Sequence, residues 1–311
     1  MATAFISHKD GLQHETPPSA PERIARLEYI FQAIEDLPLI RVDAPLASDA
    51  SIALCHPQKY TNAVRNGIPK NGFTCLDADT DKETFLSPGS AGALWRAVGG
   101  AIKAVDMVLN GEVTNAFVAM RPPGHHAEKT LPMGFCVFGN IAIAAKHALE
   151  VHRLSRVAVV DFDVHHGNGT QALLQDDPRV LFITSQQMPL WPGTGLASDR
   201  GSHQTVLNIP LAPGTDGTHA LKEYQCKALP ALNNFQPELI LISAGFDAHQ
   251  DDPLAQLNWS TDTYTDITDM LTGLAQTLCN GRVVSVLEGG YDLNALAACV
   301  HAHIKSLIKA C

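Results

Sequence analysis

Short apolar runs that alternate with helical patterns are the feature of this sequence that most restricts its fold. Five of these runs are each followed by a Gly- or Pro-marked loop and then a helical pattern: 115–120, 156–162, 179–184, 238–243 and 282–287. Weaker candidates are "TAFIS" (3–7) and "LIRVDAP" (39–45). Continuous apolar runs between helices are typical of parallel strands covered on both faces. The sequence therefore predicts an α/β fold, with a central, mostly parallel β-sheet and helices on both faces.

Helical patterns occupy most of the remaining chain, at 23–35, 89–109, 140–151, 219–234, 262–279 and 293–309. No internal repeat, low-complexity tract or linker divides the 311 residues, of which 45% are apolar. A chain of this length and composition can fill one large core. We therefore expect a single domain over 1–311.

The chain is acidic, with 22 Lys and Arg against 32 Asp and Glu and a formal net charge of -10. This charge repels nucleic acid phosphates and anionic lipid, and no apolar run is long enough to span a membrane. Its seven cysteines contain no C-x-x-C pair, so we expect reduced thiols rather than disulfides or a thiolate zinc site. These features favour a cytoplasmic protein with neither a nucleic acid nor a membrane partner.

Polar stretches follow four of the predicted strands. "RPPGHHAE" follows the first strong run, "DFDVHHGNG" ends the second, and "AGFDAHQDDP" and "EGGYDL" follow the last two. Open parallel sheets bind ligands beyond the carboxyl ends of their strands. We therefore expect a functional site where these four stretches meet.

The stretch "VAVVDFDVHHGNG" (157–169) indicates a metal site. Alternate side chains of an extended segment share a face, so Asp161, Asp163 and His165 point the same way. Asp247 supplies an oxygen donor from another strand end. Asp163, His165 and Asp247 would then leave a position open for water and substrate, as catalytic zinc sites do. From this stretch alone, a solvated strand end or a hydrogen-bonded network without metal is the alternative.

Two further motifs contain groups suited to acid–base chemistry. "PGHHAE" contributes His125 and His126, and "GGY" contributes Tyr291 after two glycines that let the backbone turn. Each motif is weak alone, because paired histidines are common in polar loops and a Tyr after two glycines is usually part of a turn. Together with the metal row they supply a base, an acid and a hydroxyl donor.

The motifs "RPPGHH", "GFCVFGN", "DFDVHHGNGTQ", "PLWPGTG", "SAGFDAHQDDPL" and "LEGGYDL" run in this order within residues 7–293. In content and order they closely resemble the zinc-dependent histone deacetylase superfamily, in its class II-like bacterial branch. The resemblance implies the arginase/deacetylase fold and hydrolysis of an N-acyl amide. It also implies one zinc ion per chain on Asp163, His165 and Asp247, and it leaves open whether iron(II) replaces zinc in the cell.

The same resemblance assigns catalytic roles. It implies Asp161 behind His125 and Asn168 behind His126, with Tyr291 as the catalytic tyrosine. A carboxylate partner favours the charged imidazolium and an amide does not, so we expect His126 to be the general base. Zinc and the Tyr291 hydroxyl would stabilise the oxyanion as it develops. Asn168 replaces the Asp of class I members, which supports the class II-like placement.

The resemblance further implies a potassium ion, a substrate tunnel and a rim residue. The potassium ligands would come from Asp161, Asp163, His165, Thr184 and Ser185, although Thr184 is as readily an ordinary strand residue. The tunnel would be lined by Gly134, Phe135, Trp191 and Leu254, although either aromatic ring could instead be core. Asp79 could correspond to the rim aspartate that binds the substrate backbone, or it could equally be a solvated turn residue.

The preferred substrate is an acyl-lysine protein or peptide, with a small acylated amine such as an acetylpolyamine as the alternative. Polyamine-selective relatives carry a glutamate at the position of Leu254, and a leucine cannot pair with a second ammonium. Net acidity near the rim, with Asp251 and Asp252, argues the other way. A homo-oligomer is compatible with the sequence.

Two other functions compete with deacylation. A two-manganese ureohydrolase would need further carboxylates where Gly167 and His249 stand, and a non-catalytic acyl-ligand binder would have lost a zinc ligand or Tyr291. Histidines outside the motifs are expected at ordinary surface or helix positions rather than as ligands: His8, His14, His56, His301 and His303.

Overall fold

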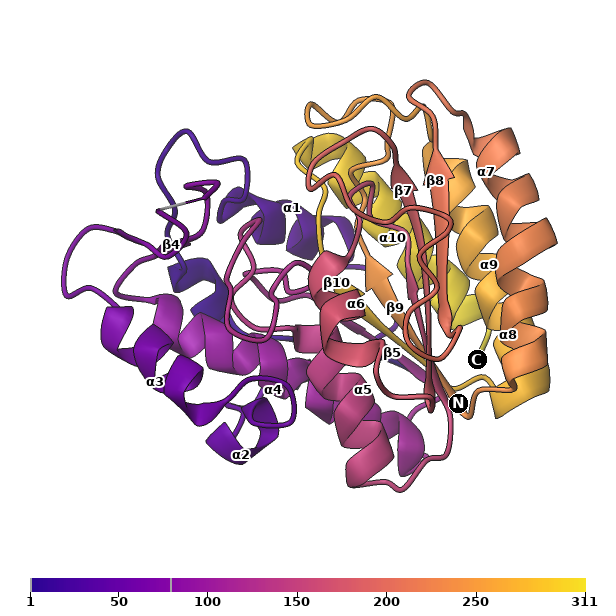
Figure 1. The fold of residues 1–311 in the computed structure, drawn as a ribbon, viewed down its shortest axis with the longest axis horizontal. Helices are drawn as coiled ribbons and strands as arrows, with labels where there is room; N and C mark the ends of the chain where they lie inside the picture. Colours follow the sequence, from indigo (N-terminus) through magenta and orange to yellow (C-terminus); the bar gives the residue numbers. More distant parts are fainter. Residues whose placement is uncertain (1, 79) are drawn as a thin grey trace.

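A single eight-stranded sheet forms the centre of the protein, in the computed structural model that describes residues 2–78 and 80–311 (Figure 1). Its strand order is β2-β1-β5-β10-β9-β6-β7-β8, and every neighbouring pair is parallel. The strands are β1 (Thr3–Ser7), β2 (Ile40–Asp43), β5 (Asn115–Val118), β6 (Val157–Asp161), β7 (Val180–Gln187), β8 (Val206–Leu211), β9 (Leu239–Ala244) and β10 (Val283–Leu287). A separate antiparallel pair joins β3 (Thr74–Cys75) and β4 (Phe85–Leu86). The predicted parallel α/β fold is confirmed.

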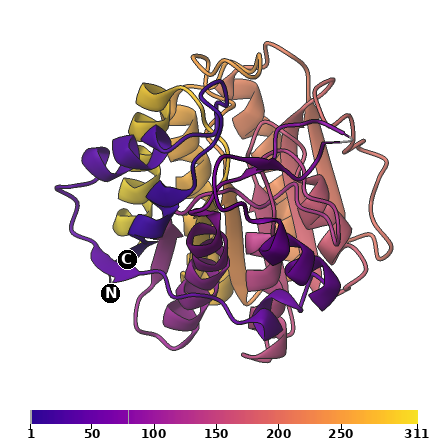
Figure 2. The ribbon, with the colours of Figure 1, turned by 90° about the vertical axis from the view of Figure 1, so that its left-hand side faces the viewer.

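Helices cover both faces of the sheet (Figures 1 and 2). One face packs against α2 (Asp49–Ile52), α3 (Gln58–Gly67), α4 (Ser90–Leu109), α5 (Asn140–Glu150) and α6 (Asn168–Leu174). The other face packs against α1 (Ala25–Ala33), α7 (Gly217–Glu223), the π-turn η2 (Tyr224–Ala228), α8 (Leu229–Phe235), α9 (Thr261–Cys279) and α10 (Leu293–Lys309). A short 3-10 helix, η1 (Lys9–Gln13), follows β1.

The continuous apolar character of the inner strands follows from this arrangement. Val157 and Val159 of β6 belong to the core on the α4–α5 face, whereas Ala158 and Val160 belong to the core on the α9–α10 face. Both faces of the strand are buried, so each of these four positions stabilises the fold by being apolar. A fully buried aliphatic side chain contributes about 1.5–3 kcal/mol.

One strand of the main sheet, β8, and the helices α2, α3 and α6 were not predicted from the sequence. Strand β8 lies at the sheet edge, and its sequence "VLNIPL" contains Asn208 and Pro210. Proline cannot donate to a ladder and is tolerated at edges, so an edge strand lacks the apolar run that marks inner strands. Helix α6 begins at Asn168, inside the motif that was interpreted for its ligands.

Strand β1 begins beside the carboxyl end of the chain, as both ribbon views show (Figures 1 and 2). The hydroxyl of Thr3 is 3.2 Å from Sγ of Cys311. All seven cysteines are free thiols. Within the described residues, the protein has no helix with both the length and the apolar character needed to cross a bilayer.

His303 connects the last helix to the sheet. On α10, its Nδ1 is 2.7 Å from the Thr268 hydroxyl of α9 and its Nε2 is 2.8 Å from the Ser285 hydroxyl of β10. The position is helical as expected, but the side chain is fully buried. Burial lowers the pKa of His303 from 6.5 to about 3.

This burial predicts a pH-dependent contribution of His303 to stability. Between pH 6.5 and 3 the unfolded chain binds a proton that the folded chain excludes, so this contribution is complete above pH 6.5 and is lost as the pH falls. We expect wild type to lose about 2 kcal/mol more than His303→Leu between pH 7.5 and 5. At pH 7.5 the variant should itself be about 1–3 kcal/mol less stable, because the Ser285 hydroxyl loses its partner.

Urea unfolding at the two pH values measures both effects. His301→Leu, on the same helix but partly exposed, is the matched control and should follow wild type. The same pH dependence in wild type and His303→Leu would contradict this role for His303.

Candidate active site

The strand order places the four polar stretches next to one another. Strands β5, β10, β9 and β6 are consecutive neighbours in the sheet, although they are spread along the chain from residue 115 to residue 287. All run in the same direction, so their carboxyl ends share one edge. The loops that follow them carry His125, His165, Asp247 and Tyr291.

Asp163, His165 and Asp247 converge at this edge with their ligand atoms within 4.8 Å of one another. Nδ1 of His165 lies 3.1 Å from Oδ1 of Asp163 and 3.2 Å from Oδ2 of Asp247. Both carboxylates are buried, and His165 is only slightly exposed. The three residues that the sequence singled out as a ligand set are therefore brought together.

The charge of this group fits a divalent cation. Burial and the neighbouring Asp163 raise the pKa of Asp247 to about 7, because two carboxylates face each other away from solvent. Burial alone would lower the pKa of His165, but hydrogen bonds to Asp163 and Asp247 raise it to about 10. A metal ion would replace that proton and neutralise both carboxylates, and two oxygens with one imidazole nitrogen suit zinc.

Backbone amides hold the two carboxylates in place. The amide of Gly289 donates to Oδ2 of Asp163 at 2.8 Å, and the amide of Val164 donates to Oδ1 of Asp247 at 2.8 Å. Each bond joins loops that follow different strands. The remaining oxygens, Oδ1 of Asp163 and Oδ2 of Asp247, are the ones that face His165.

His125 is paired with carboxylates. Its Nδ1 is 3.0 Å from Oδ2 of Asp161, and its Nε2 is 3.7 Å from Oδ2 of Asp163. Burial lowers its pKa, but the charges of Asp163 and Asp161 outweigh burial and raise the pKa to about 10. The side chain is therefore an imidazolium at neutral pH when no metal is bound.

His126 has a neutral partner instead. Its Nδ1 is 2.8 Å from Oδ1 of Asn168, and burial together with the charge of His125 holds its pKa well below the usual value. Nδ2 of Asn168 donates to Glu128 at 3.0 Å, and since a carboxylate only accepts, the amide oxygen must face His126. Nδ1 therefore carries the proton, and Nε2 of His126 has a free lone pair.

A pocket of about 380 Å³ opens above the ligand set. Its lining includes the four residues expected in the tunnel together with the reactive groups: Gly134, Phe135, Trp191, Leu254, His126, His165 and Tyr291. The ring of Phe135 lies 5.8 Å from that of Tyr291, and the ring of Trp191 lies 4.7 Å from that of His126. Gly134 has φ +53, and a Cβ there would overlap His126 and Trp191, so the glycine lets the two rings approach the backbone.

Tyr291 is directed into the pocket by its backbone. Gly290 before it has φ +116, which only glycine adopts readily, and Oδ2 of Asp252 accepts the Tyr291 amide at 2.7 Å. The Arg26 guanidinium lies 5.0 Å above its ring. Burial raises the pKa of Tyr291 well above its usual value, so the hydroxyl is a hydrogen-bond donor at neutral pH.

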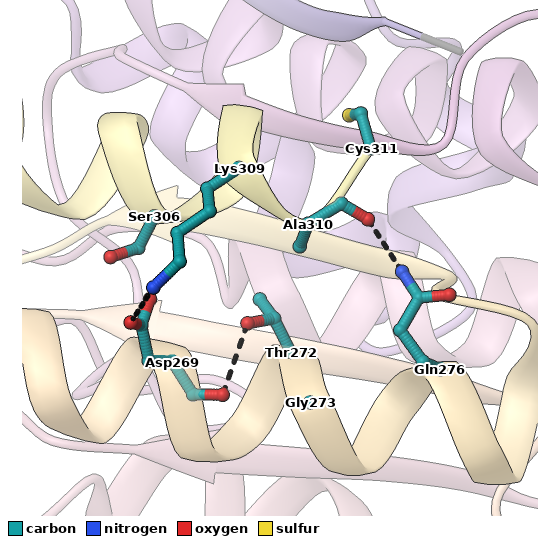
Figure 3. Close-up of a pocket in the computed structure, with 8 residues that line it drawn as sticks. All are labelled: Asp269, Thr272, Gly273, Gln276, Ser306, Lys309, Ala310 and Cys311. Carbon is teal, nitrogen blue, oxygen red and sulfur yellow. Dashed lines mark hydrogen bonds and ion pairs between the residues drawn. The ribbon is translucent and has the colours of Figure 1, made fainter.

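A second cavity, of about 450 Å³, lies between α9 and α10 (Figure 3). It is lined by Asp269, Thr272, Gly273, Gln276, Ser306, Lys309, Ala310 and Cys311. Lys309 is paired with Asp269 at 2.7 Å, and no histidine lines the cavity. The cavity therefore lacks the imidazoles that line the pocket at the strand ends, and that pocket is the candidate active site.

Several residues around the site were not predicted to be functional. Besides Glu128, buried Glu288 accepts from the amides of Gly124 and His125 at 2.7 and 3.1 Å. Asp81 and Glu83 also line the pocket. Glu128 is the last residue of "GHHAE", and Glu288 is the second residue of "LEGGY". An acidic residue within a catalytic motif was therefore the sequence signal that could have identified them.

Thr184 and Ser185, which were expected to hold potassium, have hydrogen-bond partners within the protein. Thr184 pairs with Asp161 in the β6–β7 register, and its hydroxyl is 3.3 Å from Oε1 of Gln186. The hydroxyl of Ser185 lies 2.9 Å from that of Tyr224. Asp79, the expected rim residue, lies outside the described residues.

Two histidines expected at ordinary positions are buried. Nδ1 of His14 lies 2.8 Å from the Ser90 hydroxyl, and Nε2 of His56 accepts the amide of Gly139 at 2.9 Å. Both therefore have structural hydrogen bonds.

Comparison with known proteins agrees with this arrangement. Residues 20–307 match the histone deacetylase domain model. A probable deacetylase of Archaeoglobus fulgidus is 36% identical over 302 residues, which cover 94% of this chain and 82% of that protein. The human polyamine deacetylase HDAC10 is 34% identical over 328 residues, which cover 99% of this chain and 48% of that protein. The crystal structure of the HDA15 HD domain superimposes with a TM-score of 0.92 and 30% identity, covering 99% of this chain and 90% of that one.

The parallel α/β sheet, the groups at its carboxyl edge and these similarities define a hydrolytic deacetylase. The chain belongs to the histone deacetylase family. This sets aside the two competing functions, ureohydrolase and non-catalytic binding protein.

The close packing around the ligand set predicts a strong effect of Gly289→Ala. A Cβ at Gly289 would overlap the carboxylates of both Asp163 and Asp247, so neither could keep its position. We expect the variant to bind one equivalent of zinc less than wild type after equilibrium dialysis, and to lose deacetylase activity. Gly273→Ala is the matched control, because a Cβ there meets nothing within 4 Å. Full zinc content in Gly289→Ala would contradict the assigned ligand set.

Proposed function

We propose that this enzyme removes acetyl or other acyl groups from the ε-nitrogen of lysine in proteins or peptides. The observation that carries the proposal is the pocket itself: an opening lined by Phe135, Trp191 and Leu254 that contains His126 and Tyr291 and reaches His165 of the ligand set. A neutral acylated amine on an aliphatic stem matches such a pocket, whereas a free ammonium would be penalised by desolvation.

Asp163, His165 and Asp247 would hold one zinc ion, or iron(II) in its place. When bound, the ion supplies Lewis-acid polarisation of the amide carbonyl and lowers the pKa of a coordinated water. The support is the donor set: two buried carboxylates and one imidazole within 4.8 Å of one another, with the pKa of Asp247 raised to about 7 by burial and by Asp163.

His126 would be the general base and then the acid toward the leaving amine. Its Nε2 has a free lone pair on the pocket side, because Nδ1 is bonded to Asn168. Its pKa is held well below the usual value by burial and by His125, which keeps it neutral and able to accept. The same bond to Asn168 fixes the ring as it takes and returns the proton.

His125 and Tyr291 would have electrostatic and hydrogen-bonding roles and would not act as bases. An imidazolium at His125, held by Asp161, would add a positive charge next to His126, whose ring centroid is 3.9 Å away. The protonated hydroxyl of Tyr291 would donate to the carbonyl oxygen as negative charge develops on it. Such a donor contributes about 3–4 kcal/mol to transition-state stabilisation.

The aromatic rings would hold the substrate stem and exclude water. Phe135 and Trp191 both line the pocket, and burying the four methylenes of a lysine side chain contributes about 3 kcal/mol. Leu254 at the pocket adds an apolar contact and offers no partner for a second ammonium.

We also propose a potassium site and a single-domain organisation. A potassium ion would be held by oxygens of Asp161, Asp163, His165, Thr184 and Ser185, because the Thr184 hydroxyl is buried beside Asp161. Residues 1–311 would form a single domain, because one sheet collects strands from both ends of the chain. The cytoplasmic location and a homo-oligomeric state stay predictions.

A second candidate substrate is an acetylated polyamine, and one feature of the pocket favours it. Asp81 and Glu83 line the pocket with Leu254, and both are at least partly exposed. These two carboxylates would attract the second ammonium of a polyamine. They would take over the role of the glutamate that polyamine-selective relatives have at the position of Leu254. The similarity to the human polyamine deacetylase is a further argument for this alternative.

The proposed mechanism predicts that Tyr291→Phe and His126→Ala keep fold and zinc but lose turnover. Neither side chain belongs to the ligand set, and each acts in the transition state, so kcat should fall about 10²-fold or more. Steady-state kinetics, with zinc analysis and circular dichroism of the same samples, measures this. Wild-type kcat in either variant would remove that residue from the mechanism.

For substrate choice, we expect kcat/KM for an acetyl-lysine peptide to exceed that for acetylated putrescine and cadaverine. Leu254→Ala should leave this order unchanged and weaken peptide turnover through lost contact. Glu83→Gln separates the alternatives, because it should lower turnover of the polyamines only if Glu83 binds their second ammonium. The lysine preference would be contradicted by a kcat/KM for acetylcadaverine about tenfold or more above that for the peptide, or 1.4 kcal/mol, if this ratio stayed the same in Leu254→Ala.

A further inference from the structure

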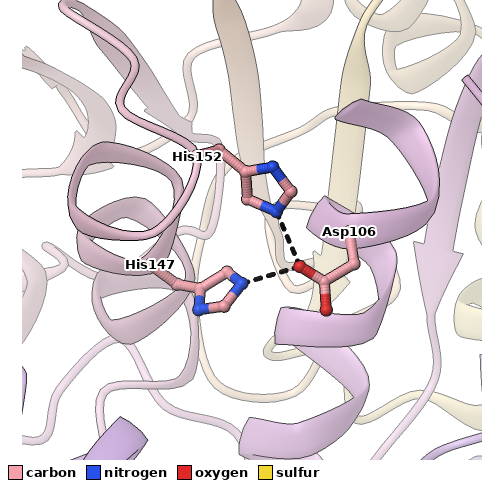
Figure 4. Close-up of side chains that lie close together, drawn as sticks. All are labelled: Asp106, His147 and His152. Atoms are coloured by element: carbon pink, nitrogen blue, oxygen red, sulfur yellow. Dashed lines mark hydrogen bonds and ion pairs between the residues drawn. The ribbon is translucent and has the colours of Figure 1, made fainter. Parts of the chain in front are cut away.

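A second group of metal-ligand side chains lies outside the active site, between α4 and α5 (Figure 4). Asp106 is on α4, His147 is in the last turn of α5, and His152 follows in the next loop. Their ligand atoms lie within 4.8 Å of one another. We propose that Asp106, His147 and His152 form a second binding site for a divalent transition metal ion.

The chain turns back on itself to bring the two histidines together. Helix α5 ends at Glu150, and Arg153 has φ +60, in the left-handed region. The amide of Leu154 then donates to the carbonyl of Ala148 at 3.2 Å, which closes the turn. His152 therefore faces α4 from the loop, beside His147 from the helix.

The three side chains meet at a single oxygen. Nε2 of His147 and Nε2 of His152 each lie 2.7 Å from the same Oδ1 of Asp106. The ring centroids are 5.4 Å apart with planes at 71°, so the rings approach that oxygen from different directions. Without metal, each ring donates its Nε2 proton to the carboxylate. That arrangement is a complete hydrogen-bonded contact, and it is the alternative to a metal site.

A small movement converts this contact into a coordination site. Ligands about 2.0–2.1 Å from a tetrahedral ion are ~3.3 Å apart, so each nitrogen–oxygen separation would have to open by ~0.6 Å, and the two nitrogens already lie within 4.8 Å of each other. The side chain of Asp106 is 33% exposed and that of His152 is 19% exposed, which leaves both room to move. Water can reach the same side and supply the fourth ligand.

The donor set selects the kind of ion. Two imidazole nitrogens and one carboxylate oxygen suit Zn²⁺, Ni²⁺ or Cu²⁺, whereas Mg²⁺ and Ca²⁺ prefer oxygen ligands alone. An ion here would tie α4, α5 and the following loop together, so its effect would be on stability.

This site is distant from the candidate active site. The His152 loop leads into the amino end of β6 at Val157, whereas the active-site residues follow the carboxyl end of the same strand. The five residues of β6 alone span ~16 Å. The protein would then hold two ions, against the single ion expected from the sequence.

The test is zinc content after equilibrium dialysis at micromolar free Zn²⁺, in the full-length protein. We expect two equivalents in wild type, and one in each of Asp106→Asn, His147→Ala and His152→Ala. These three variants should keep wild-type kcat, and added zinc should raise the melting temperature of wild type more than theirs. His219→Ala, which removes an exposed histidine paired with Glu223, is the control and should retain two equivalents.

Asp247→Asn separates this inference from the proposed function. It removes an active-site ligand, so it should keep one equivalent, held at the second site, and the double variant Asp247→Asn/His152→Ala should bind none. A single equivalent in wild type that Asp247→Asn abolishes would overturn the second site. A second equivalent that survives in both Asp106→Asn and His152→Ala would also overturn it.

Discussion

Two carboxylates, Asp163 and Asp247, face each other in the interior, and the rest of the site is arranged around that repulsion. Burying two like charges is unfavourable unless a cation or hydrogen bonds compensate them. Here backbone amides of Gly289 and Val164 satisfy the outward oxygens, and His165 lies between the inward ones. The remaining imbalance is what makes the position suited to a divalent ion. Stability and catalysis are therefore in conflict at this point of the fold.

The two neighbouring histidines show how the same surroundings produce two different groups. His125 and His126 are adjacent in sequence and equally buried, yet the first has Asp161 as its partner and the second has Asn168. The carboxylate raises one pKa to about 10 against burial, while burial and the adjacent charge lower the other. A charged residue and a neutral base thus stand side by side, because only one of the two partners is ionised. Glu128 accepts a hydrogen bond from Nδ2 of Asn168 and so fixes the orientation of the amide that contacts His126.

The sequence predicted what depends on local pattern and missed what depends on distant neighbours. Inner strands such as β6 are apolar on both faces, so their runs were visible, whereas the edge strand β8 has one solvated edge and contains Pro210. The ligand set and histidine partners followed from family motifs. The buried roles of His303 and Glu288, and the meeting of Asp106 with His152, involve residues dozens of positions apart. No local spacing in the chain reports such contacts.

The position of β10 in the sheet has a consequence for how the protein becomes active. This last strand lies between β5 and β9, and it carries Gly289 and Tyr291 into the site. During synthesis, the first 280 residues contain every proposed metal ligand, but β5 and β9 cannot yet be bridged. Pairing strands so distant in sequence is slow, because a large loop must close first. A nascent chain should therefore remain inactive until β10 and the loop after it have been inserted, so that catalytic competence reports completion of the sheet.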